Sequence, residues 1–398
     1  MYKRKAFDDI TNVCFHDNTH TKKDNSNQVA DLFPHLPCKD SETMTQQADR
    51  FQNVHPLLGW DKHDLQTGVL SYDEFCELMK PDNDVQLIDL LTQIGVFPAC
   101  NTCLLCGGEM RKIKEGDHWF WICRRRVNGV KCQKKKKSIR TDTILGNSHL
   151  SVQSIQQIIW HFVHHLSEKQ CTDYTKISSR NNTTVVKWYG FCRDVCTRWF
   201  WNPDNTPKLG GFGVIVEMDE SFFPGNPKYN RGRRLGEHAY KDDEKWVFGL
   251  AQRGSLDAII LQVPCKRSRK DLIPIIDKNC LDGTVFCSDG WKAYHKLKEH
   301  LELEDCDNFA VNHSRNFVDP VTGAHTQTIE GLWRHCKNFL TTFGMKPKDL
   351  STYLGTFLWH RFCKQRKLDM FIKFLKCASE VHPPVKNVLP TGTMTFAI

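Results

Sequence analysis

The sequence predicts an α/β protein in which a small cysteine-rich domain and a helical region precede a catalytic core. Three observations support this prediction. Cysteines cluster near residue 100, two amphipathic and aromatic segments with helical spacing follow, and the second half alternates short β-branched runs with a helical segment. A length of 398 residues is enough for two or three domains.

The composition excludes several classes of protein. Hydrophobic residues make up 40% of the chain and aromatic residues 11%, which is too much apolar material for a disordered chain. The net charge of +9 favours a polyanionic partner. The first residues, MYKRKAFDDITN, contain no apolar run, so we interpret the 18 cysteines as reduced thiols with at least one metal site rather than disulfides. No segment is apolar enough to span a membrane, which predicts a soluble protein without a membrane partner.

The N-terminal part carries little regular pattern. Residues 1–70 are rich in polar side chains, and we expect them to be disordered. Residues 71–99 are expected to form short helices. The first of these, residues 71–80, starts with a capping box in which Ser71 is followed by Glu74.

Residues 100–140 are predicted to form a zinc ribbon. A C-x-x-C pair and a later cysteine pair can place four thiolates around one tetrahedral ion. The expected ligands are Cys103, Cys106, Cys123 and Cys132. Eight residues separate the second pair, which is a wide spacing, and Cys100 also forms C-x-x-C with Cys103, so it remains an alternative ligand. Ordinary buried thiols are the other interpretation.

Basic residues surround the cysteines. They are Arg124, Arg125, Arg126, Lys134, Lys135, Lys136, Lys137 and Arg140. On a zinc ribbon we expect these side chains to contact DNA phosphates, whereas the same run can also be a solvated face or a nuclear import signal.

Residues 150–202 are predicted to be a helical DNA-binding region. Two amphipathic helices, 152–166 and 183–201, flank a polar segment and resemble a helix-turn-helix unit. Lys187 and Arg193 on the second helix are expected to meet phosphates or base edges. The alternative is a helical connector whose aromatic side chains are core.

Residues 212–345 are expected to form the catalytic core. The predicted strands are residues 212–218, 245–252, 258–263 and 284–288, and the helix before the last strand is 270–279. Strand-strand-strand-helix-strand is the opening order of a ribonuclease-H-like α/β domain. Two further helices are expected within residues 346–382, followed by a tail from residue 383.

Three carboxylates carry the predicted chemistry. Asp219 is expected at the end of the first strand and Asp289 at the end of the fourth, while Glu330 lies beside the apolar stripe of a helix at 325–340. Two aspartates and a glutamate can hold two Mg²⁺ or Mn²⁺ ions for phosphoryl transfer. Each acid alone could instead be a cap or turn residue, and alternation gives Glu220 only a secondary role.

Several segments resemble Merlin-type transposases and their bacterial insertion-sequence relatives. They include CLLCGGEM, SIRTDTIL, VIVEMDESFF, FCSDGWKAYHKL and HTQTIEGLWRHCK, and the resemblance covers roughly residues 85–380. It implies a ribonuclease-H-like core with its acidic triad at Asp219, Asp289 and Glu330. It also implies a DNA-binding N-terminal part and activity that excises an element and inserts it elsewhere.

The expected function is therefore that of a DNA transposase that binds element ends and catalyses metal-dependent strand cleavage and strand transfer. Its expected partners are the terminal inverted repeats, target DNA and further copies of the chain, in the nucleus. Two alternatives stay open. One is a domesticated DNA-binding regulator, and the other is a ribonuclease-H-like nuclease. The sequence of the repeats and the oligomeric state do not follow from the residues.

Overall fold

The computed structural model describes residues 68–132, 136–146, 148–177, 183–223, 245–263, 267–311, 318–319, 323–341 and 349–384. All of these belong to one compact unit, Asn53–Ile398. Most of the predicted disordered region and most of the predicted tail lie outside the described residues. Within the described ranges, no helix combines the length and the apolar character that crossing a membrane requires.

The described residues begin with two α-helices joined by a short 3-10 helix. These are α3 (Tyr72–Leu78), η1 (Pro81–Asn83) and α4 (Asp84–Ile94). The predicted capping box is confirmed, because the Ser71 hydroxyl accepts from the Glu74 N–H and the Glu74 carboxylate accepts from the Ser71 N–H. α4 packs against α11 (Met370–Val381), where the Ser379 hydroxyl donates to the Ile94 carbonyl over 3.3 Å.

The cysteine-rich segment forms a small sheet. β1 (Met110–Glu115) and β2 (His118–Cys123) pair in antiparallel fashion, and β5 (Lys137–Ser138) pairs with β2. β3 (Arg126–Val127) and β4 (Val130–Lys131) make a separate hairpin. The Trp119 indole N–H donates to Asp84 over 3.0 Å, and Lys114 pairs with the same carboxylate, which joins this sheet to α4.

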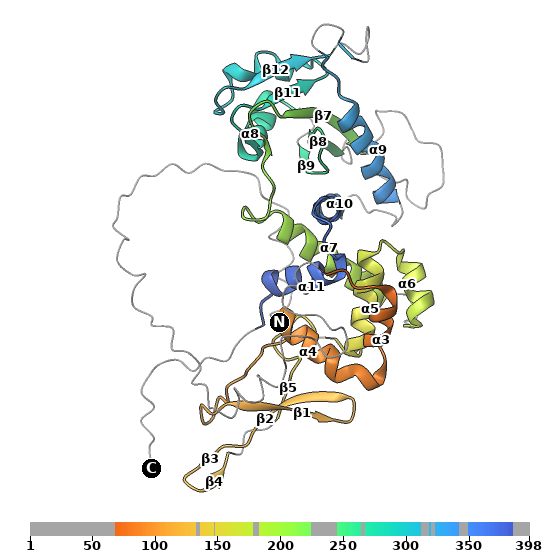
Figure 1. The fold of residues 1–398 in the computed structure, drawn as a ribbon, viewed down its shortest axis with the longest axis vertical. Coiled ribbons are helices and arrows are strands. Elements are labelled where there is room, and N and C mark those ends of the chain that lie inside the picture. The colour runs from red at the N-terminus through yellow and green to blue at the C-terminus, as the bar shows by residue number, and fades with distance from the viewer. Residues whose placement is uncertain are drawn as a thin grey trace, which may run out of the picture. The chain divides into compact units, whose positions relative to one another are not determined.

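Three helices follow where two were predicted. They are α5 (Val152–Val163), α6 (Glu168–Thr175) and α7 (Thr183–Phe200). The sequence of α6, EKQCTDYT, buries only Cys171 and therefore carries almost no apolar pattern. α7 packs against α5, α11 and α10 (Leu350–Gln365), so the predicted helical region and the C-terminal helices share one core (Figure 1).

A five-stranded mixed sheet forms the second half of the chain. Its strands are β7 (Ile215–Phe223), β8 (Lys245–Gln252), β9 (Ala258–Val263), β11 (Val285–Ser288) and β12 (Asp307–Ala310), in the order β12-β11-β7-β8-β9. β7, β8 and β9 are antiparallel, whereas β11 and β12 run parallel to β7. α8 (Arg269–Asn279) joins β9 to β11, and β6 (Leu209–Gly210) pairs with β10 (Cys280–Leu281) beside them. This arrangement is consistent with the predicted ribonuclease-H-like domain.

β7 is longer than predicted, and this corrects the position of Asp219. The strand continues to Phe223, so Asp219 lies within it and pairs with Gly249 of β8 rather than ending it. α9 (Gln327–Thr341) packs against β7 and β8. Gly249 permits this close approach, because a Cβ atom there would lie 2.6 Å from the ring of Trp333.

Candidate active site and candidate metal centre

The structure places the three predicted carboxylates on three neighbouring elements. Asp219 lies in β7, Asp289 directly follows the neighbouring strand β11, and Glu330 lies in the first turn of α9, which packs on β7. Burial raises the pKa of the Asp219 carboxyl to about 6, and the negative charges of Asp289 and Glu330 act in the same direction. The charges of Asp289 and Glu330 are therefore close enough to act on Asp219.

Each carboxylate is oriented by a hydrogen-bond donor. The Trp333 indole N–H donates to Asp219 over 2.8 Å, and the Trp291 backbone N–H donates to Asp289 over 3.0 Å. The Thr326 hydroxyl donates to Glu330 over 3.2 Å. Asp219 is half-buried while Asp289 and Glu330 are exposed, so the group opens to solvent on the side of the two exposed acids.

A fourth acid, Glu217, joins β7 to the start of α9. Its side chain is fully buried and pairs with Arg253 at 2.9 Å, while its other oxygen accepts the Ile329 N–H over 3.0 Å. The Arg253 guanidinium also donates to the His325 carbonyl over 3.0 Å. Residues 217 and 219 share one face of the strand, so this network fixes α9, and with it Glu330, against the face that carries Asp219.

Sequence reasoning missed Glu217 as a site residue. The signal was present, because a glutamate stands between Val216 and Met218 in an otherwise apolar strand, and a charge that is fully buried must be paired.

Glu220 lies on the opposite face of β7, as alternation predicts. Its side chain is 4% exposed, accepts a hydrogen bond from the Tyr294 hydroxyl and lies 3.8 Å from Arg267. Burial raises its pKa to about 7, and the charges of Asp219 and Asp289 add to the effect. Tyr294 belongs to η3 (Lys292–Tyr294), just after Asp289, so Glu220 links β7 to the turn that carries Asp289.

The chemistry of this group suits hard divalent cations. Three carboxylates supply only oxygen donors, which Mg²⁺ and Mn²⁺ prefer over the nitrogen and sulfur donors typical of zinc. Burial is the main cause of the raised pKa of Asp219, and a bound cation would offset both this burial and the smaller effect of the charges of Asp289 and Glu330. The donor chemistry of the three acids is that of a divalent-cation site, whereas the group of ligand atoms that already lie together in the described residues is that of the four cysteines.

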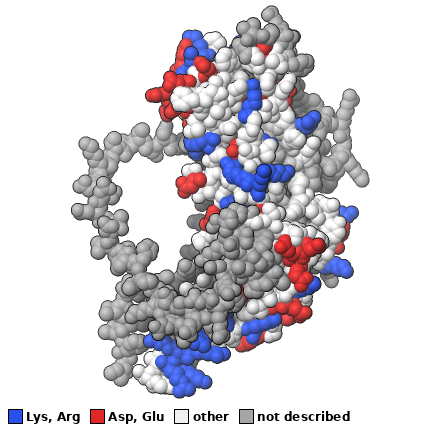
Figure 2. Space-filling view, viewed as in Figure 1, with Lys and Arg blue, Asp and Glu red and all other residues white. Residues whose placement is uncertain are grey.

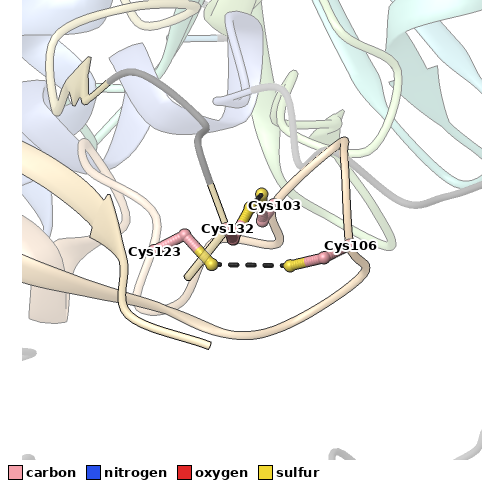
Figure 3. Close-up of side chains that lie close together, drawn as sticks. All are labelled: Cys103, Cys106, Cys123 and Cys132. Atoms are coloured by element: carbon pink, nitrogen blue, oxygen red, sulfur yellow. Dashed lines mark hydrogen bonds between the residues drawn. The ribbon is translucent and has the colours of Figure 1, made fainter. Parts of the chain in front are cut away.

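Four thiols converge in the cysteine-rich sheet (Figure 3). The sulfur atoms of Cys103, Cys106, Cys123 and Cys132 all lie within 4.8 Å of one another. The Cys103–Cys132 and Cys106–Cys123 separations are 3.7 and 3.5 Å. A tetrahedral ion with Zn–S bonds of about 2.3 Å sets its sulfurs about 3.8 Å apart, so the cluster could bind zinc. Cys100 is not part of this group.

The predicted basic residues fall into four sets. Arg124, Arg125 and Arg126 are exposed. Lys136 and Lys137 pair with Glu115 and Asp142, while Lys134 and Lys135 lie outside the described residues. Arg140 corrects the prediction, because its guanidinium donates to the carbonyls of Leu145, Ser148 and Leu150 and so holds the loop after β5.

On α7, the prediction for Arg193 is wrong. The residue is only 8% exposed, lies over the ring of Tyr353 and faces Glu168, because α7 is a core helix rather than a free recognition helix. Lys187 is exposed and lines a groove of about 910 Å³ together with Trp188 and Phe191. Of the two predicted contacts on this helix, only Lys187 faces solvent.

The segment that carries the three carboxylates matches a known protein family. Residues 208–361 match the family model of the ISXO2-like transposase domain. This ISXO2-like segment contains all three acids, Glu217 and the whole five-stranded sheet, and it ends within α10. The match supports a transposase of this type, for which DNA is the implied partner. No curated protein matches the chain.

Proposed function

We propose that this chain is a DNA transposase of the Merlin type that binds the ends of its element and carries out metal-dependent strand cleavage and strand transfer. One observation carries the proposal. Three carboxylates stand on the neighbouring elements β7, β11 and α9 inside the segment that matches the ISXO2-like transposase domain, and two of them raise the pKa of the third.

Asp219, Asp289 and Glu330 are the residues that would hold two Mg²⁺ or Mn²⁺ ions. When bound, such ions activate a water molecule or a 3′-hydroxyl group and stabilise the leaving oxygen of a phosphodiester. The rest of the work falls to the chain. Trp333 orients the Asp219 carboxylate, and the Glu217 network holds α9 so that Glu330 stays beside β7.

The N-terminal half is proposed to bind duplex DNA. A zinc ion held by the four cysteines would stabilise the segment that makes the contacts. The exposed arginines of the β3–β4 hairpin and Lys187 supply positive charge for phosphate contacts. Pairing two element ends calls for at least two copies of the chain, and the nucleus is the compartment in which this substrate is available.

The zinc assignment predicts about one zinc per chain in the purified native protein. The Cys103→Ala, Cys106→Ala double variant is expected to lose that ion, because two of four thiolates are removed. The local sheet should then unfold, since it buries little apolar surface of its own. Elemental analysis measures the content, and native protein without zinc would overturn the assignment.

The raised pKa of Asp219 predicts a pH-dependent stability in metal-free protein. The folded state holds this proton at a pKa of about 6 against an ordinary value of 3.8, so the contribution to stability is complete below about pH 4 and is lost as the pH rises through 6. The melting temperature of wild type should therefore fall relative to Asp219→Asn over this interval, and Mg²⁺ should restore it above pH 6. A constant difference between the two proteins would contradict the prediction.

A strand-transfer assay tests the proposed function itself. The purified chain is incubated with Mg²⁺, a target plasmid and DNA carrying the inverted repeats that flank its reading frame. Joined products with a short duplication of the target are expected. Binding without any cleavage would instead identify a domesticated regulator, and nicks without joining would identify a nuclease.

A further inference from the structure

The hairpin between Cys123 and Cys132 stands out from the cysteine-rich sheet. All of residues 124–131 are exposed, and the strands pair Arg126 with Lys131 and Val127 with Val130. Asn128 and Gly129 adopt φ values of 51° and 79°, as a two-residue type I′ turn requires. In Figure 2, blue side chains gather at the bottom of the view, where Figure 1 places β3 and β4.

Within the described residues, the hairpin is hydrogen-bonded to the rest of the cysteine-rich segment at its base. The Cys132 N–H donates to the Arg125 carbonyl over 2.9 Å, and the Arg125 guanidinium turns back to the Cys106 carbonyl at 3.1 Å. A two-stranded hairpin of this length is unstable by itself in water. Its two ends lead directly into two thiols of the metal cluster, so a bound ion would clamp the base and leave the tip free.

Two features of the tip are unfavourable in water. Arg126 and Lys131 face each other directly, and like charges in that position repel. On the other face, Val127 and Val130 are 41% and 63% exposed. The segment 124–131 contains no acidic residue that could offset the charge. A polyanion whose groove contains apolar surface would neutralise the two like charges and would also cover the two valines.

We propose that the β3–β4 hairpin enters the major groove of duplex DNA as a two-stranded ribbon, with the two valines against base edges and the long side chains of Arg126 and Lys131 reaching from the opposite face to the phosphates at the edges of the groove. The inference rests on the proposed DNA-binding function. Strands about 4.8 Å apart fit a groove about 12 Å wide, and valine methyl groups can contact thymine methyl groups. Duplex RNA does not offer such a groove, since its major groove is deep and narrow.

The test uses the full chain and a pool of synthetic DNA duplexes with randomised cores. Wild type selects its preferred sequences, and affinity is then measured against salt. The Arg126→Gln, Lys131→Gln double variant should flatten the slope of log affinity against log salt by about two. The Val127→Ser, Val130→Ser double variant should keep the slope but lose about tenfold in preference for the selected duplex. Arg111→Gln, at an exposed position of β1, is the matched control and should keep the selected sequences.

Further measurements separate the hairpin from folding and from the proposed function. Zinc content equal to wild type shows that each variant is folded. Replacing thymine by uracil in the selected duplex removes methyl groups from the major groove only, and it should weaken wild type but not the valine variant. A valine variant that selects the same sequences as wild type, or a loss confined to RNA duplexes, would overturn the inference. Wild type that binds no DNA duplex would instead overturn the proposed function.

Discussion

The Asp289→Asn variant is expected to cleave DNA on the order of 10⁴-fold more slowly than wild type. An amide lacks the charge that holds a divalent cation, and the site is left one ligand short. Asp289 is exposed, so its replacement should leave the fold intact and should not lower the melting temperature. The measurement is single-turnover cleavage of end-containing DNA in Mg²⁺, with duplex affinity measured on the same preparation.

Asp219→Asn and Glu330→Gln should cause losses of similar size, and combining any two should add little, because a site that lacks one ligand is already broken. Glu220→Gln is the matched control. Its amide oxygen still accepts the Tyr294 hydroxyl, so most of the activity should remain. Near-normal cleavage by Asp289→Asn would refute the assignment of the three acids.

The Glu217→Ala variant is expected to lose about 3 kcal/mol of folding free energy, because removing one partner leaves the other charge and the Ile329 N–H without their acceptor in the interior. Thermal and urea unfolding measure the loss. Glu217→Gln keeps an acceptor for Ile329 and should lose less. Glu302→Ala, an exposed acid of the same domain, should change stability by no more than about 0.5 kcal/mol.

A cleavage assay distinguishes a positioning role of Glu217 from a purely structural one. If the network positions Glu330, then Glu217→Gln at a temperature where it is fully folded should still need more Mg²⁺ than wild type for half-maximal cleavage. Unchanged Mg²⁺ dependence in the folded variant would limit Glu217 to stability.

Local patterns predicted most of the sheet and its helices. Residues 245–252 and 258–263 were predicted as strands and are β8 and β9, since β-branched runs bounded by turn residues leave little choice. The capping box at Ser71 was equally readable. β7 was cut short because Asp219, Glu220 and Ser221 interrupt the apolar run, although all three pair with β8.

Local sequence did not predict which basic side chains are exposed and which are bonded within the protein. Arg140 and Arg193 resemble the exposed Arg124 and Arg126 in the sequence, yet one is saturated by backbone carbonyls and the other is buried against Tyr353. The outcome for Arg193 depends on a partner 160 positions away (353 − 193), and that for Arg140 on how the loop just after it folds back on its side chain. The same reason hid the role of Glu217, whose partners lie in the turn after β8 and at the start of α9.

Crystals of the full chain soaked in Mn²⁺ offer the most direct test of the central claim that the three acids form one metal site. Anomalous scattering locates manganese without any assumption about DNA or activity. We expect two ions about 3.5–4 Å apart, contacted by Asp219, Asp289 and Glu330. Both ions should be lost in Asp289→Asn crystals. Manganese bound elsewhere, or no peak among these three carboxylates at saturating Mn²⁺, would contradict this claim.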